Sequence, residues 1–215
     1  MSALRRVFLP VLALASALCS ADGRAQSLRE QLFAAVAGGD IAQTARLVRA
    51  GIHYTARNAE GESALYVAAE KGHLPVAALL LDNGAEVGAR TANGETALHA
   101  AAMLEEPALA ALLLDRGAQK DAANRDGEMP LHWAAMTGTL AVVKLLIERG
   151  APLNAADARG NTPLHAAAGT GGTEVLAYLL SKKARISARN KAGQRPIDLA
   201  RARGHGEAVK LLQGR

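Results

Sequence analysis

The sequence predicts an all-α solenoid in which about six helix–turn–helix units stack against one another. Three observations support this fold class. One set of glycines recurs every 33 residues, at Gly61, Gly94, Gly127, Gly160 and Gly193. Apolar residues keep the same spacing, at Leu65, Leu98, Leu131, Leu164 and Ile197. Half of the residues are apolar but only 3% are aromatic, which suits short, closely packed helices better than β-strands. A fixed period of this length is typical of stacked repeat architectures.

Residues 157–189 illustrate how one unit is expected to fold. Gly160 predicts a turn, because glycine adopts positive φ angles without strain. Thr162 is then a suitable N-cap, and Pro163 suits the first position of a helix, where its missing N–H costs nothing. A second helix is expected over residues 174–180, beyond a glycine-rich break. Since neither short helix can bury its apolar face alone, neighbouring units must stack.

The motif at the start of this unit resembles the ankyrin repeat. Residues 162–167 read Thr-Pro-Leu-His-Ala-Ala, with copies at 129–134 and 96–101 and a weaker one at 63–68. Both this motif and the 33-residue period are typical of that family. The resemblance implies an ankyrin-repeat solenoid whose helix pairs are joined by β-hairpin-like turns.

The register of the motif divides the chain into six units. Four full repeats are expected at 58–90, 91–123, 124–156 and 157–189, between degenerate caps at 26–57 and 190–215. Ser27 with Glu30 three residues later is typical of a capping box that opens the first helix. The last unit carries charges where inner repeats are less charged, as a terminal repeat without a covering neighbour requires; these residues are Arg195, Asp198, Arg201 and Arg203.

Two departures from the repeat predict local weakness. Residues 105–107, Glu-Glu-Pro, replace the Gly-His-Leu of residues 72–74, so the turn between the two helices must be rebuilt there. Lys183 stands where glycine ends the corresponding helix in other repeats. A left-handed helix stop is less favourable for lysine than for glycine, by about 1 kcal/mol.

Residues 1–25 have the layout of a secretory signal peptide. Arg5 and Arg6 precede an apolar run over residues 7–18, and cleavage is expected after Ala21 or Ala25. The alternatives are an uncleaved anchor or a frayed first helix. The run is shorter than the roughly 20 residues that a membrane-spanning helix needs, which disfavours the anchor. The mature chain is therefore expected in the periplasm or outside the cell, without membrane insertion.

Cys19, the only cysteine, lies within this leader. Lipidation of Cys19 is a further alternative, but Leu18 stands where a lipoprotein has a small residue. Once the leader is removed, disulfides, thiolate nucleophiles and cysteine-bound zinc are excluded. A chain without cysteine also suits an oxidising compartment.

Charge and chemistry argue against two other classes of function. The formal net charge of +5 includes arginines of the leader, and what remains is too weak and scattered for a nucleic-acid interface. His99, His132 and His165 lie one repeat apart, so stacking separates them by about 8–10 Å; zinc ligands converge within ~2 Å of one ion. The ankyrin resemblance instead implies that each of these histidines hydrogen-bonds across a repeat turn. No catalytic residue, metal or cofactor is expected.

The ankyrin resemblance implies a concave groove, lined by the turn tips and the ends of the first helices. Carried over by repeat position, the expected partner contacts are Glu60, Glu62, Glu70, Lys71, Asn93, Glu95, Met103, Leu104, Arg125, Asp126, Glu128, Trp133, Met136, Thr137, Arg159 and Asn161. Met103, Leu104, Trp133 and Met136 are favoured as a binding hot spot, since exposed methionine and aromatic residues are enriched in such places. For Trp133 the alternative is packing against the next repeat.

The expected function is that of a non-catalytic protein–protein interaction scaffold. We expect a monomer in the periplasm of a Gram-negative bacterium that binds or protects another envelope protein. The alternative is a secreted effector that imitates eukaryotic ankyrin proteins and binds a host target. Fold alone does not identify the partner.

Overall fold

The computed structural model describes residues 26–52 and 55–214. The predicted signal peptide, 1–25, lies outside the described residues, together with Cys19 and both expected cleavage sites. A first helix covers residues 26–37. It is followed by α2 (Ile41–Arg49), α3 (Ala64–Glu70), α4 (Leu74–Asp82), α5 (Ala97–Ala101), α6 (Ala108–Asp115), α7 (Pro130–Thr137), α8 (Leu140–Glu148), α9 (Pro163–Thr170), α10 (Thr173–Ser181), α11 (Pro196–Ala202) and α12 (Gly206–Gln213).

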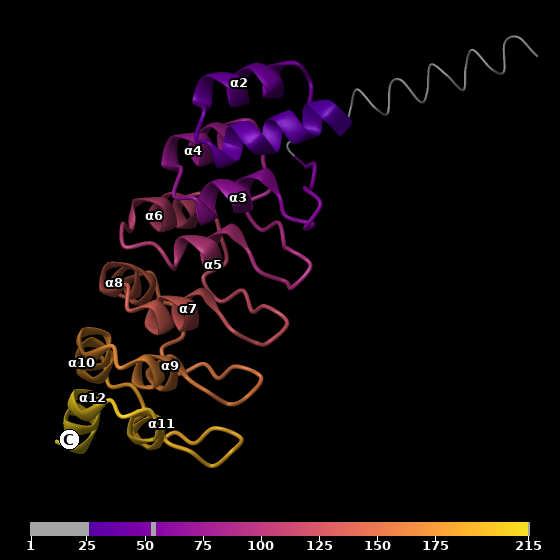
Figure 1. Cartoon of the computed structure of the whole chain (residues 1–215). Helices are drawn as coiled ribbons and strands as arrows, with labels where there is room; N and C mark the ends of the chain where they lie inside the picture. Colours follow the sequence, from indigo (N-terminus) through magenta and orange to yellow (C-terminus); the bar gives the residue numbers. More distant parts are fainter. Residues whose placement is uncertain (1–25, 53–54, 215) are drawn as a thin grey trace, which may run out of the picture.

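The helices stack in two layers along a curved array (Figure 1). The inner layer contains α3, α5, α7, α9 and α11, and the outer layer contains α4, α6, α8, α10 and α12. Between consecutive pairs the chain projects to one side as a long turn, which we call a finger. Within residues 26–52 and 55–214 the structure has no strand and one isolated antiparallel bridge, Arg57 to Ser63. The all-α solenoid predicted from the repeat period is confirmed.

The leucine columns form the core between the layers. Their inner members are at most 1% exposed and their outer members are fully buried; they are Leu65, Leu98, Leu131 and Leu164, and Leu80, Leu113, Leu146 and Leu179. Alanines at Ala68, Ala101, Ala134 and Ala167 are also fully buried. Their small side chains let neighbouring helices approach, which explains why so alanine-rich a chain can form a continuous core.

The start of α9 follows the local sequence rules. Gly160 has a φ of +81°, Thr162 is the N-cap with an extended backbone, and Pro163 is the first helical residue. All three predictions are confirmed. The second helix of the unit, Thr173–Ser181, is one residue longer at each end than predicted.

The capping box predicted at Ser27 is wrong, because residues 26 and 27 already lie within the first helix. Ser27 instead accepts a hydrogen bond from Gln31 one turn later, at 3.4 Å. The well-formed cap of this terminal unit is Asp40, whose Oδ1 accepts from the backbone N–H of Gln43 at 2.8 Å at the start of α2.

The turn at residues 105–107 is rebuilt, as predicted. In other repeats a glycine with positive φ follows the inner helix, for example Gly72 and Gly138. A positive φ is energetically unfavourable for Glu105, because it has a Cβ atom. Helix α5 accordingly ends at Ala101, after only five residues, and the chain continues through tight backbone bonds such as Leu104 N–H to the Ala101 carbonyl at 3.2 Å.

Lys183 has a φ of +67°, and within the described part of the chain it is the only residue other than glycine in this region. We expect Lys183→Gly to raise the free energy of unfolding by about 0.5–1 kcal/mol. The left-handed conformation costs an L-residue roughly 1–2 kcal/mol, and the greater conformational entropy that glycine loses on folding offsets part of this gain. Urea denaturation measures the difference. The neighbouring Lys182, with a φ of −85°, is the control: Lys182→Gly should destabilise, and stabilisation by both variants would contradict the explanation.

Candidate protein-binding groove

A ladder of three histidines fixes the geometry between the inner helices and the fingers. In each, Nδ1 accepts a backbone N–H at the start of its own helix at 3.1 Å. The opposite nitrogen, Nε2, therefore carries the proton and donates to a carbonyl of the following finger. These bonds run from His99 to Glu128 (3.1 Å), from His132 to Ala155 and Asn161 (3.1 Å each), and from His165 to Gln194 (3.0 Å). The predicted bonding across the repeat turn is confirmed, and each ring also joins two repeats.

Burial lowers the pKa of the His99, His132 and His165 imidazoles below the usual 6.5, although neighbouring carbonyls partly oppose the shift. Each ring is thus neutral near pH 7, as its acceptor role at Nδ1 requires. A proton on Nδ1 would remove the bond that caps the helix.

Stability is therefore expected to fall as the pH drops below about 6.5. Below this pH the histidines of the unfolded chain bind protons, whereas the buried rings of the folded protein stay neutral. The stabilisation that these rings provide is therefore complete above the histidine pKa of the unfolded chain and is lost as the pH falls toward their lower pKa in the folded protein. Urea denaturation at pH 8.0 and 5.5 measures this loss. His132→Gln should be less stable at pH 8.0 but less sensitive to acid. An unchanged pH dependence in this variant would argue against the histidine ladder as the cause.

Backbone hydrogen bonds hold neighbouring finger tips together. The N–H of Arg125 donates to the Asn93 carbonyl at 2.8 Å, that of Ala158 to Asp126 at 2.7 Å, and that of Lys191 to Arg159 at 2.9 Å. Several residues predicted at the groove rim, including Asn93, Arg125 and Arg159, thus have fixed spacing from one finger to the next.

Two arginines add a second tie that the sequence did not reveal. Arg90 Nη1 donates to the carbonyls of Gly94 in its own finger (2.8 Å) and Ala123 in the next (2.7 Å). Arg57 makes the equivalent bonds to Gly61 and Arg90. Each guanidinium therefore bridges two fingers.

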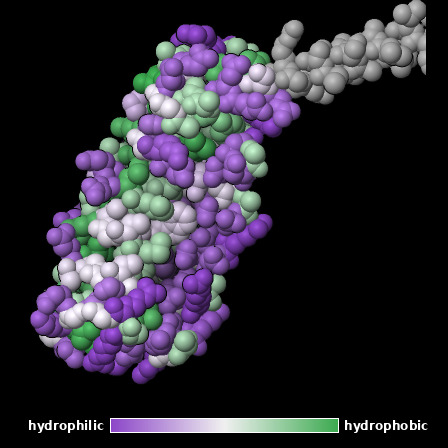
Figure 2. Space-filling view, in the orientation of Figure 1, coloured by the Kyte–Doolittle hydropathy of each residue, from purple (hydrophilic) through white to green (hydrophobic). Residues whose placement is uncertain are grey.

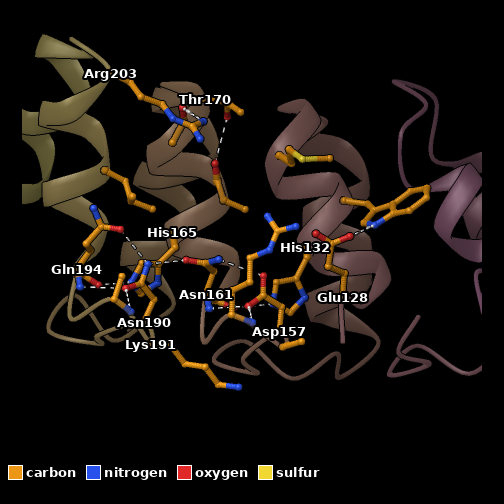
Figure 3. Close-up of a pocket in the computed structure, with 18 residues that line it drawn as sticks. Glu128, His132, Asp157, Asn161, His165, Thr170, Asn190, Lys191, Gln194 and Arg203 are labelled. Carbon is orange, nitrogen blue, oxygen red and sulfur yellow. Dashed lines mark hydrogen bonds between the residues drawn. The ribbon is translucent and has the colours of Figure 1, made fainter. Parts of the chain in front are cut away.

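A hollow of about 560 Å³ opens between α7, α9 and α11 and the fingers that precede them (Figure 3). Five of the predicted contact residues line it: Glu128, Trp133, Met136, Arg159 and Asn161. Its volume is within the range of pockets that hold a small ligand or a few side chains of a partner.

Sequence reasoning missed the residues that the last unit contributes to this hollow. Lys191 and Arg203 line it and lie on opposite sides of it in Figure 3, Lys191 at a finger tip and Arg203 beside Thr170. They occupy the repeat positions of Arg125 and Lys71. Extending the repeat register into residues 190–215 would have found both.

The predicted apolar contacts differ in exposure. Met103 is 45% exposed and Met136 44%, whereas Leu104 is half-buried. Trp133 is also half-buried; its Nε1 donates to Glu128 at 2.9 Å and its ring meets the His99 ring edge-on at 5.4 Å. The indole therefore contacts the preceding repeat, and it also lines the hollow. In Figure 2, pale and green residues over the inner helices adjoin the hydrophilic fingers.

The predicted acidic contacts within the fingers fall into two groups. Glu60 and Asp126 are exposed at finger tips. Glu62, Glu95 and Glu128 are half-buried, and each accepts a side-chain hydrogen bond within its own finger. These three carboxylates support the fingers, and Glu128 also lines the hollow.

The other predicted contacts lie at the ends of the inner helices. Glu70 and Lys71 are exposed at the end of α3 and pair with each other at 3.1 Å. Thr137 is exposed at the end of α7, but its hydroxyl donates to the Trp133 carbonyl at 2.9 Å. It is therefore already satisfied within its own helix.

Stacked helix pairs with projecting fingers and a lined groove define a helical repeat scaffold. The family model for ankyrin repeats (three copies) matches residues 32–124, 83–157, 112–190 and 131–214, which together span nearly the whole described chain. The chain belongs to the ankyrin repeat family. Among curated proteins, none matches it.

Ankyrin arrays are protein–protein interaction modules and are generally non-catalytic. Within residues 26–52 and 55–214, no three side chains of His, Cys, Asp and Glu are placed to hold a metal ion. The helices in the same part of the chain are too short or too polar to cross a membrane.

Proposed function

We propose that this protein is a non-catalytic scaffold, exported to the bacterial periplasm as a monomer, that binds or protects another envelope protein through its concave groove. The observation that carries the proposal is the exposed pair Met103 and Met136, 45% and 44% accessible at equivalent positions of adjacent repeats. Such large apolar side chains release water when a partner covers them, which favours association.

The rigid surroundings of this pair support a binding role. Trp133, between them in sequence, is held by Glu128 and by the His99 ring. Ties between fingers fix the groove rim before any partner arrives. A surface already in its bound shape loses less entropy on association.

Cross-linking at the groove tests the binding site. A photoreactive amino acid replaces Met136 in one strain and Ala141, exposed on the outer helix α8, in another. We expect a discrete covalent adduct with one protein from Met136 and none from Ala141. In a separate affinity purification, the variant with both Met103→Asp and Met136→Asp should no longer capture that protein, although its circular dichroism spectrum stays unchanged. Equal adducts from both positions, or capture that survives the double substitution, would contradict the proposal.

The basic and apolar leader over residues 5–25 supports export. Cell fractionation of the tagged full chain tests it. Recovery of a shortened chain in the periplasm is expected. Recovery from the culture medium would favour the effector that binds a host target, and a full-length chain in the cytoplasm would overturn export.

A further inference from the structure

Charge is distributed unevenly along the groove. In the finger position directly after the turn glycine, the first three fingers carry Glu62, Glu95 and Glu128, but the last two carry the uncharged amides Asn161 and Gln194. Loss of these carboxylates leaves the carboxy-terminal half of the groove more positive than the amino-terminal half.

Three cations surround the hollow in that half: Arg159, Lys191 and Arg203. Within the described part of the chain, none of them forms an ion pair with a carboxylate. Arg203 donates one N–H to the Gly169 carbonyl at 2.8 Å, and its other guanidinium N–H groups remain for a partner.

The two carboxylates that line the same hollow already have hydrogen-bond partners. Asp157 accepts from the backbone N–H groups of Arg159 and Asn161 at 2.8 and 2.7 Å, and from the Asn161 amide at 3.2 Å. Glu128 accepts from Trp133 and Asn124 at 2.9 and 3.3 Å. Each supports its own finger, so a partner meets chiefly cationic donors.

The cations and the apolar patch share one surface. Trp133 and Met136 line the hollow together with Arg159, Lys191 and Arg203. An occupant must therefore complement the apolar side chains of Trp133 and Met136 and the three cationic side chains at the same time. A nucleic acid is disfavoured, because three cations are few for its closely spaced phosphates and Trp133 is a single ring for base stacking.

We infer that the occupant of this hollow is an acidic and apolar segment of a protein partner. Its carboxylates lie against Arg159, Lys191 and Arg203, and its neighbouring apolar side chains cover Trp133 and Met136. The inference rests on the proposed role of the groove in protein binding and adds the chemistry of the segment that is bound. It also sets its orientation, because the glutamates of the amino-terminal half repel the acidic end.

An array of synthetic peptides of equal length tests the inference on the purified protein. The peptides share their leucine and phenylalanine positions and differ only in whether the intervening positions carry Glu, Gln or Lys. We expect the Glu peptides to bind about tenfold more tightly than the Gln peptides, since two or three partly exposed charge pairs together supply that much. Added salt should weaken the binding of the Glu peptides most.

Charge reversal locates the site. Arg159→Glu with Lys191→Glu should weaken Glu-peptide binding at least tenfold and favour the Lys peptides. The control is Lys144→Glu with Lys182→Glu, which changes the net charge equally on α8 and at the C-cap of α10, where both lysines are exposed. This control should bind as the parent does.

Each outcome decides a specific point. Equal binding of Glu and Lys peptides, equal loss in the control variant, or tighter binding of a fluorescent oligonucleotide overturns the acidic segment. If Gln peptides bind as tightly as Glu peptides but do not bind the Met136→Asp variant, the preference for an acidic segment is overturned, while the proposed scaffold function still stands. No peptide binding together with no cross-link at Met136 would overturn both.

Discussion

Replacement of Leu146 by alanine is expected to lower the free energy of unfolding by about 3–5 kcal/mol. The Leu146 side chain is fully buried in α8, near the middle of the array, where repeats on both sides hold the backbone in place. The cavity can therefore collapse only partly, and the loss includes both transfer energy and lost contacts. Urea denaturation followed by circular dichroism measures the change.

The neighbouring Leu145 provides a matched control. It lies in the same helix but is only partly buried, so Leu145→Ala should cost less than half as much. Because each repeat contacts only its neighbours, Leu146→Ala should also broaden the unfolding transition as the two ends of the array uncouple. Similar losses from the two variants would show that α8 is not packed as described.

Replacement of Gly127 by alanine is expected to cost about 3 kcal/mol. Gly127 has a φ of +72°, and an added Cβ would lie 2.7 Å from the backbone nitrogen of Ala158. That nitrogen donates to Asp126 at 2.7 Å and joins two finger tips. The substitution therefore combines an unfavourable backbone conformation with a clash that pushes neighbouring fingers apart. Thermal denaturation measures the loss.

Gly193 separates the two causes. It holds the same place in the last repeat with a φ of +75°, but an added Cβ meets no heavy atom within 4 Å. Gly193→Ala should cost only the conformational part, about 1–2 kcal/mol. If Gly127→Ala costs no more than Gly193→Ala, the expected clash with Ala158 contributes nothing to the loss of stability.

Periodicity was the part of the sequence that predicted most of the fold. The 33-residue columns identified the stacked helices, the cap at Thr162 and the positive φ of Lys183, and the ankyrin resemblance added the roles of the three ladder histidines. Each of these follows from a local rule applied at a fixed place in the repeat. The misplaced cap at Ser27 shows the limit of such rules, because Ser-x-x-Glu also occurs inside helices and only the structure shows where a helix begins.

The groove was predicted less completely, because it is assembled from several repeats. Lys191 and Arg203 come from the degenerate last unit, where the weakened motif hides the repeat position. The guanidinium bridges of Arg57 and Arg90 depend on how far two fingers lie apart, which no single repeat specifies. Burial is also hard to infer: Met103 and Leu104 are adjacent in sequence, yet only Met103 is exposed.

The ties between fingers are not uniform along the array. The fingers that contain Asn93 and Arg125 are joined twice, by the Arg125 N–H and by the Arg90 guanidinium. Ala123 and Ala156 replace that arginine in the two following fingers. The fingers of Asp126 and Ala158 then keep one tip bond, from the Ala158 N–H. The next two fingers are joined twice, by the Lys191 N–H and by the Asn190 amide, which donates to Asn161 Oδ1 at 2.9 Å. The joint with a single tip bond thus lies between the fingers of Asp126 and Ala158, beside the part of the hollow that Trp133 and Met136 line. If the groove adjusts to a partner, the movement is expected at that joint, with the doubly tied fingers on either side of it moving as two units.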